Sequence, residues 1–125
     1  MEYSACRFVC SVYWRRLQQL QQEADRRALE VQFVILSIDP ENDSPASWRE
    51  YRKARGLARS NWHFLTATRA VASRAAALLG VRWWYLDGHL MHDFKIVRLD
   101  AEGGIAAAMT TFDEPVDPLL ATSLR

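Results

Sequence analysis

The sequence predicts an α/β domain in which helices cover both faces of a mixed sheet. Two observations lead to this prediction. Helical and strand-like patterns alternate along most of the chain, and the pattern of an antiparallel hairpin follows them. The chain has 125 residues and half of them are hydrophobic, which is the size and composition of one domain with its own core. We therefore expect residues 1–125 to form a single domain.

The first half of the chain alternates between helix and strand patterns. From Val9 to about Leu29 apolar residues recur every three or four positions, which indicates an amphipathic helix. Residues 31–38 are short, β-branched and nearly all apolar, as in a strand that is covered on both faces. Residues 44–56 begin with a Ser-Pro pair and end in Gly, which is typical of a capped helix. Residues 62–65 form a short strand candidate.

The second half predicts a helix, a hairpin and a final short helix. Residues 66–80 start with a capping Thr66 and stop at a Gly. His92 to Leu99 alternate as a strand, residues 100–104 are a turn, and residues 105–109 are the return strand. Asp117 and Pro118 open the last helix. This order of elements is that of a thioredoxin-like domain.

The predicted fold requires a strand before Cys6, and residues 1–5 are the whole of the sequence in front of it. We therefore expect the N-terminal strand of the domain to be truncated. An open, apolar sheet edge would remain, and such edges favour self-association or strand exchange, which makes a homo-oligomer an expectation of the sequence.

Composition and charge exclude several classes of function. The formal net charge is +1 and the arginines do not form one stripe, so no nucleic-acid partner is expected. No run of 18 apolar residues is present that would span a membrane. The first residues lack the basic and apolar regions of a signal peptide.

The chemistry of the chain is expected at its two cysteines, Cys6 and Cys10. They lie at a predicted strand-to-helix junction, where unpaired N–H groups and the helix dipole stabilise a thiolate. A thiolate is both a nucleophile and a metal ligand. Spaced one helical turn apart, the two sulfurs can close a redox-active disulfide or converge on one soft metal ion. The remaining alternative is a pair of buried cysteines that act as small hydrophobic residues.

Three histidines, His63, His89 and His92, are candidates for a third ligand. Two thiolates and one imidazole form a soft ligand set that suits Cu(I) and also holds Cu(II). His92 is expected at a loop–strand border, from which its side chain can point toward the cysteine-bearing end of the first helix. Spacing alone does not choose between His89 and His92.

Four segments match, in order, the pattern of one protein family. They are Tyr3-Ser4-Ala5-Cys6-x-x-x-Cys10, residues 34–45 with their Ile-Asp-Pro-Glu-Asn-Asp-Ser-Pro run, Phe64-Leu65-Thr66 with Leu79-Gly80-Val81, and His92 with Asp100-Ala101-Glu102-Gly103. This pattern resembles the SCO/SenC family of thioredoxin-like copper proteins. The chain differs from it between the cysteines, where Arg7 and Phe8 stand in place of Pro-Asp.

The resemblance implies that copper, as Cu(I) or Cu(II), is bound by Cys6, Cys10 and His92. It also implies a metallochaperone rather than an enzyme. Such a protein delivers copper to the binuclear copper site of a cytochrome c oxidase subunit, or keeps the thiols of that site reduced. The implied location is the periplasm or the mitochondrial intermembrane space, behind a membrane anchor upstream of this chain.

Two other functions remain open at this point. A thiol–disulfide oxidoreductase would use Cys6 and Cys10 as its attacking and resolving thiols without a metal. A third reading is a domain that has kept the fold and lost both activities. His92 distinguishes the first two readings, because only a copper site requires it.

Overall fold

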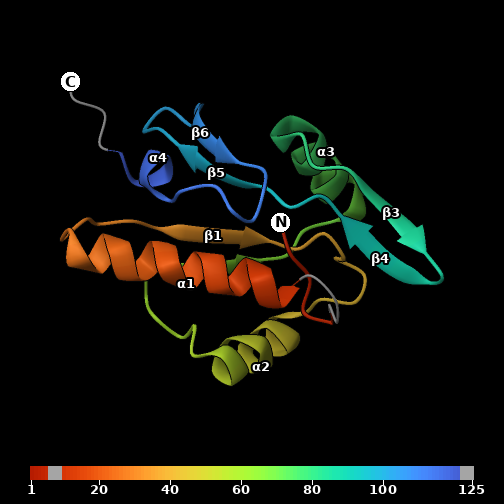
Figure 1. Ribbon diagram of the computed structural model, residues 1–125. Coiled ribbons are helices and arrows are strands. Elements are labelled where there is room, and N and C mark those ends of the chain that lie inside the picture. The colour runs from red at the N-terminus through yellow and green to blue at the C-terminus, as the bar shows by residue number, and fades with distance from the viewer. Residues whose placement is uncertain (6–9, 122–125) are drawn as a thin grey trace.

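The computed structural model describes residues 1–5 and 10–121 of the chain. Figure 1 shows its elements. They are α1 (Cys10–Arg26), β1 (Phe33–Leu36), α2 (Pro45–Arg55), β2 (Trp62–Leu65), α3 (Arg69–Leu79), β3 (Trp83–Leu86), β4 (His89–His92), β5 (Ile96–Leu99), β6 (Ile105–Met109) and α4 (Asp117–Leu120). The predicted alternation of helices and strands, followed by a hairpin and a last helix, is confirmed.

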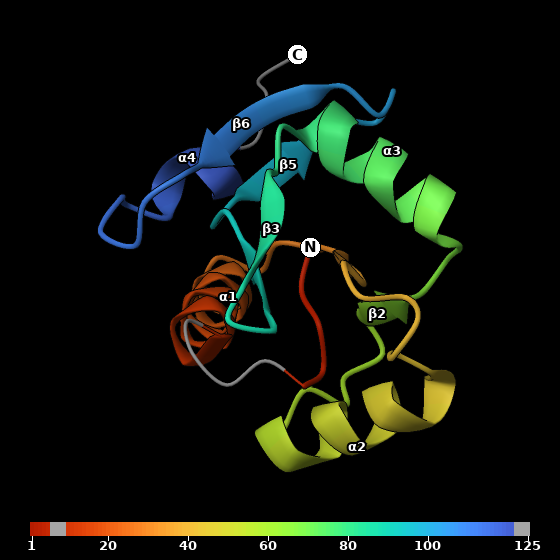
Figure 2. The same cartoon turned by 90° about the vertical axis from the view of Figure 1, so that its right-hand side faces the viewer.

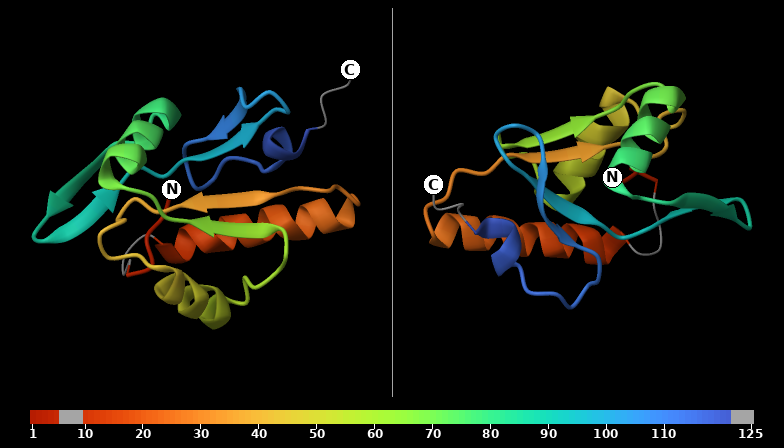
Figure 3. Two further views of the ribbon diagram at one scale, coloured as in Figure 1. Left: turned by 180° about the vertical axis from the view of Figure 1, so that it is seen from behind. Right: turned by 90° about the horizontal axis from the view of Figure 1, so that it is seen from above.

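Helices lie on two sides of the parallel pair formed by β1 and β2. Helices α1 and α2 lie on one side of this pair and α3 lies on the other (Figures 1 and 3). The hairpin of β5 and β6 lies with α4 near one end of the molecule (Figure 2). Within the part of the chain that is described, strands pair only two by two, as β1–β2, β3–β4 and β5–β6. None of the described helices has the length and apolar character needed to span a bilayer.

Strand β1 is covered fully on one face only. Phe33 and Ile35 are buried in the main core with residues of α1 and α2. Val34 points to the opposite face and is 60% exposed. The expectation of a strand buried on both faces is therefore wrong at this position. The reason is the placement of α3, which packs through Ala76 against Ile38, beyond the end of β1.

The residues that start and stop the helices lie close to where the sequence predicts them. Ser44 caps α2 in a reciprocal hydrogen-bond box with Ser47, and Gly56 ends this helix in the left-handed conformation at φ 65°. Helix α3 starts later than expected, because the side chain of Thr68, rather than Thr66, accepts a hydrogen bond from the Val71 amide at 3.2 Å. The expected cap at Thr66 is wrong by two residues.

Thr68→Ala is expected to lower the free energy of unfolding by about 1 kcal/mol, because the variant loses the cap of α3. The same substitution at the exposed Thr66 is the matched control and is expected to change stability by less than about 0.5 kcal/mol. Urea unfolding of the two variants measures the difference. Equal effects at both positions would show that Thr68 does not act as the cap.

A second hairpin, formed by β3 and β4, is absent from the prediction. Asp87 and Gly88 form its two-residue turn with φ angles of 50° and 75°, and Leu86 lies opposite His89. An Asp-Gly pair is a strong signal for such a turn, because both central residues need a positive φ. His92 consequently ends β4 instead of beginning the next strand, which starts at Ile96. His89 belongs to the same strand and not to a loop.

The N-terminal segment lies beside the end of β1 and is joined to the following residues by one isolated bridge. Glu2 forms a parallel bridge with Ser37. Its amide donates to the Leu36 carbonyl at 3.1 Å, and its carbonyl accepts from the Ile38 amide at 2.9 Å. Both backbone groups of Glu2 are therefore held by the last residue of β1 and by the chain directly after it. This arrangement places the residues before Cys6 at the carboxyl end of the parallel pair.

Candidate metal centre

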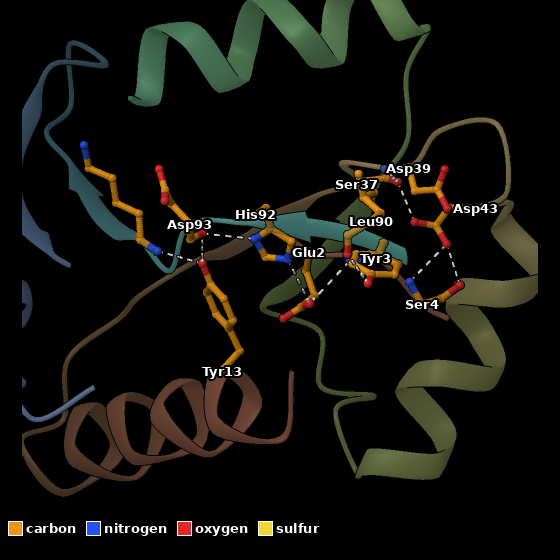
Figure 4. Close-up of polar contacts among 11 residues, drawn as sticks. Glu2, Tyr3, Ser4, Tyr13, Ser37, Asp39, Asp43, Leu90, His92 and Asp93 are labelled. Atoms are coloured by element: carbon orange, nitrogen blue, oxygen red, sulfur yellow. Dashed lines mark hydrogen bonds and ion pairs between the residues drawn. The ribbon is translucent and has the colours of Figure 1, made fainter. Parts of the chain in front are cut away.

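His92 is the predicted ligand that the structure describes in full, and it lies inside the molecule. Its side chain is 5% exposed. The rings of Tyr3 and Tyr13 pack against the imidazole, with ring centroids 5.8 Å and 5.5 Å away (Figure 4). Tyr3 comes from the N-terminal segment and Tyr13 from the first turn of α1. His92 is thus enclosed by the two segments that flank the cysteine region.

The hydrogen bonds of His92 define which ring nitrogen is available as a ligand. Nδ1 lies 3.0 Å from the carbonyl oxygen of Asp93. Because a carbonyl oxygen only accepts, Nδ1 carries the proton of the neutral ring and Nε2 carries the lone pair. Burial lowers the pKa of His92 from its ordinary value, so the neutral form is favoured. A neutral imidazole is the form that binds metals.

Tyr13 fixes the distance between α1 and the segment that follows His92. Its hydroxyl donates to the Asp93 carbonyl at 2.8 Å and accepts from the Lys95 amide at 2.6 Å. Burial raises the pKa of Tyr13, so the hydroxyl keeps its proton. Cys10 is the first residue of α1 and precedes Tyr13 by three positions. Positions three apart lie on the same side of a helix, so the backbone of Cys10 is one turn from the packing contact with His92.

The cysteine pair itself is described only in part. Cys6 lies outside the described residues, as do Arg7 and Phe8. Cys10 is described as the first residue of α1, and its side chain lies outside the description. The geometry of the two predicted thiol ligands is therefore still a prediction of the sequence.

Glu2 is a second ionisable group in contact with His92, and sequence reasoning missed it. Its side chain is 4% exposed, and Oε1 lies 3.8 Å from Nε2 of His92 (Figure 4). Burial, opposed by the nearby amino group of Met1, raises the pKa of Glu2 to about 8. The lowered pKa of His92 and the raised pKa of Glu2 both favour the uncharged forms of the two groups. The residues that border a small cavity together with Glu2 are largely apolar: Trp14, Leu17, Ile35, Tyr51, Leu57, Trp62 and Phe64.

One oxygen of the Glu2 carboxyl group has no hydrogen-bond partner. Oε1 accepts a long hydrogen bond from the Tyr3 amide at 3.4 Å. Oε2 is buried and makes no hydrogen bond. A buried polar atom in this condition is costly and is uncommon in native proteins. The sequence places Glu2 in the short strand predicted before Cys6, but it carries no sign that this side chain is buried.

Asp43 holds the N-terminal segment in place just before Cys6. Its carboxylate accepts hydrogen bonds from the amide of Ser4 at 3.1 Å and from the hydroxyls of Ser4 and Ser37 (Figure 4). Asp39, in the same loop, accepts from the Asn42 side chain at 3.0 Å. Both aspartates therefore organise the loop, and Asp43 also determines where the chain enters the cysteine region.

The described part of the site presents an imidazole nitrogen and a carboxylate from two different segments. Both groups can bind metals, and Oε2 of Glu2 makes no hydrogen bond. Among the described residues no group of three or more His, Cys, Asp or Glu side chains could hold a metal ion, so a complete site requires the predicted thiolates. His63 is not part of this group: it lies exposed on β2, with Nε2 at 2.7 Å from Oε1 of Gln32.

Comparisons with known proteins agree with this fold. A SCO1/SenC family lipoprotein from Bacillus anthracis str. Ames is 22% identical, with a TM-score of 0.78 over 86% of this chain and 66% of that one. Copper-bound ScoI of Arabidopsis thaliana is 18% identical, with a TM-score of 0.77 over 94% and 73%. A putative electron transfer protein from Aquifex aeolicus VF5 is 16% identical, with a TM-score of 0.80 over 94% and 72%. The predicted thioredoxin-like mixed sheet with flanking helices is confirmed.

The sequence comparisons identify the family. The SCO1 protein homolog of Bacillus subtilis (strain 168) is 28% identical over 64 residues, which are 51% of this chain. The match spans 33% of that relative, so this chain corresponds to about a third of its length. A family model described as SCO1/SenC matches residues 1–117. This match covers nearly the whole chain, and the protein therefore belongs to the SCO1/SenC family.

Proposed function

We propose that this protein binds copper through the thiolates of Cys6 and Cys10 and through Nε2 of His92. The copper is cargo, which the protein passes to the binuclear copper site of a cytochrome c oxidase subunit. In a related role, the reduced pair reduces a disulfide in that site: the partner gains two thiols while Cys6 and Cys10 form a disulfide, so electrons and protons balance. Membership of the SCO1/SenC family supports this assignment.

The observation that carries the proposal is the state of His92. The imidazole is buried, its Nδ1 is engaged by the Asp93 carbonyl, and its Nε2 is left with a lone pair. It packs against Tyr13, one turn from the residue that starts α1. A buried, neutral imidazole whose ring is oriented by a hydrogen bond at Nδ1 is the form in which histidine binds a metal through Nε2.

We expect the reduced protein to bind one Cu(I), and His92→Ala to weaken this binding at least tenfold, because one of three ligands is lost. The measurement is an anaerobic titration against a competing chelator. Cys6→Ser and Cys10→Ser test the two thiolates in the same way. His63→Ala is the matched control, because this histidine is exposed on β2 and should leave the affinity unchanged.

Absence of Cu(I) binding by the reduced wild-type protein would refute the copper assignment. Equal Cu(I) affinity of wild type and His92→Ala would remove His92 from the site and favour the thiol–disulfide oxidoreductase. That protein would keep its exchange activity in the His92→Ala variant, whereas both cysteine variants would lose it.

We also propose that the protein works outside the cytoplasm, anchored to a membrane that faces the periplasm. This proposal is supported by the family assignment and by the similarity to a protein described as a lipoprotein. To test this proposal, cells that produce the full-length protein are fractionated after removal of their outer envelope. The expected result is detection of the protein in the membrane fraction.

A further inference from the structure

We propose that the outer edge of β3 is an interaction surface, and that its partner is the same edge of a second copy of this chain. The two β3 strands pair antiparallel across a two-fold axis and join the two hairpins into one continuous sheet. The pairing requires no copper. This edge is different from the N-terminal one, at which the sequence predicts self-association.

The register of the hairpin leaves backbone groups of β3 without partners. Leu86 and His89 flank the two-residue turn and therefore form the hydrogen-bonded pair that closes it. Hydrogen-bonded and non-hydrogen-bonded pairs alternate in an antiparallel ladder, so Trp83 and Tyr85 direct their N–H and C=O groups away from β4. Among the described residues, no partner is found for these groups.

The opposite edge of the hairpin, on β4, is covered by the molecule itself. The hydroxyl of Tyr3 donates to the carbonyl oxygen of Leu90 at 2.5 Å, and Leu90 is the register partner of Tyr85. This bond agrees with a Tyr85–Leu90 pair whose backbone groups point outward. In the described part of the chain, β3 therefore carries the edge of the hairpin that remains open.

The open edge lacks the features by which proteins protect such strands. β3 has the sequence Trp-Trp-Tyr-Leu, which contains no charged residue and no proline, and its register with β4 has no bulge. The hairpin projects from the rest of the molecule, so the edge is accessible (Figures 1 and 3). An exposed, regular and apolar edge of this kind is a template for a further strand.

A second copy satisfies this edge in one register. When Trp84 faces Trp84 of the second copy at the two-fold axis, Trp83 of each copy lies opposite Tyr85 of the other and exchanges both backbone hydrogen bonds with it. Moving the axis along β3 would instead require pairing with the turn residue Asp87 or with the buried Val81. The outward-facing residues thus select one symmetric arrangement.

The side chains at the edge are complementary to those of a second copy. Trp84 is 43% exposed and lies on the face of the hairpin opposite the buried Leu90. The two Trp84 rings would be neighbours in a non-hydrogen-bonded pair, in which cross-strand side chains are closest. Leu86, which is 56% exposed, would lie opposite Arg82, whose aliphatic stem covers it. This register brings no like charges together.

The size of the surface indicates a weak dimer. The exposed parts of Trp84, Tyr85 and Leu86 together amount to on the order of 300 Å². A standard interface buries about 800 Å² per partner, so the paired hairpins alone bury less than a permanent dimer needs. We therefore expect a reversible monomer–dimer equilibrium with a dissociation constant in the micromolar to millimolar range.

Sedimentation equilibrium of the whole chain over a wide range of concentration tests this surface. A thiol reductant is present, so that dimers linked through Cys6 or Cys10 are not counted. Trp84→Lys places two positive charges side by side at the axis and is expected to raise the dimer Kd at least about tenfold. Leu78→Lys is the matched control, because Leu78 is an apolar residue that is 75% exposed on α3. Its Kd should stay within about twofold of wild type.

Amide hydrogen exchange of the wild-type protein gives a second readout that needs no variant. The amides of Trp83 and Tyr85 should exchange more slowly as the concentration rises, in proportion to the dimer fraction from sedimentation. The amide of Trp84 is the internal control, because the register directs it toward Met91 within the hairpin. Its exchange should depend much less on concentration.

Three results would overturn the proposal. Wild-type protein that stays monomeric at all concentrations, as expected if β3 pairs with a strand of a different protein, excludes the second copy as partner. A dimer that Trp84→Lys leaves unchanged, or that Leu78→Lys weakens equally, has its contact elsewhere. Exchange of the Trp83 and Tyr85 amides that does not depend on concentration excludes the edge pairing, and this readout holds even if Trp84→Lys does not fold.

Discussion

Glu2→Gln is expected to abolish most of the loss of stability that the metal-free protein shows as the pH rises from about 4.5 to about 8. The pKa of Glu2 is raised by burial from 4.5 to about 8 in the folded chain. A raised pKa means that the stabilising contribution is complete below the unfolded value and is lost as the pH rises through the folded value. The difference between 4.5 and about 8 corresponds to a loss of about 5 kcal/mol at most. Gln cannot ionise, so the variant should not show this loss.

The measurement is urea unfolding of wild type and Glu2→Gln at pH 5 and pH 8.5. His92 acts in the opposite direction, because its lowered pKa gives stability that is present above about 6.5 and is lost as the pH falls. His92 is present in both proteins, so the difference between them isolates Glu2. Parallel pH dependences of the two proteins would show that the Glu2 carboxyl group titrates normally.

Asp43→Ala is expected to lower the free energy of unfolding by about 3 kcal/mol. The substitution leaves the amide of Ser4 and the hydroxyl of the fully buried Ser37 without their acceptor. Each buried donor that loses its partner costs about 1–3 kcal/mol. Chemical denaturation measures the loss at neutral pH.

Asp100→Ala is the matched control for Asp43→Ala. The Asp100 carboxylate also accepts two backbone amides, from Glu102 and Gly104, but in an exposed turn where water replaces them. We expect a loss below about 1 kcal/mol there. Cu(I) affinity adds a second readout, because only Asp43→Ala frees the segment before Cys6. Equal losses of stability in the two variants would contradict the structural role of Asp43.

The parts of the fold that the sequence predicted well are those that local patterns determine. The caps of α2, the stop of α3 at Gly80 and the bounds of β2 follow from residues that are neighbours in the chain. Exposure of Val34 was not predictable in this way, because it depends on where a distant helix packs. The Asp87-Gly88 turn was a local signal that was overlooked, and its hairpin moved His92 to a different strand.

The candidate site was predictable as far as its residue types, but not as an assembly. His92 emerged from the family resemblance, whereas its contact with Glu2 joins the first residues of the chain to β4. No spacing rule connects two positions so far apart. Burial of a lone carboxyl group is also rare enough that sequence reasoning places such a residue at the surface.

The single bridge between Glu2 and Ser37 has a consequence for strand register. Side chains alternate across a strand, so Glu2 faces the cavity beside Leu17, while Tyr3 faces the opposite cluster around Leu90. A slip by one residue would exchange these two side chains and remove the carboxyl group from His92. It would also change the direction in which the chain enters the cysteine region. One backbone bridge cannot prevent such a slip by itself. The bond from Ser4 to Asp43 is the second fixed point, and it makes the register of this short segment unique.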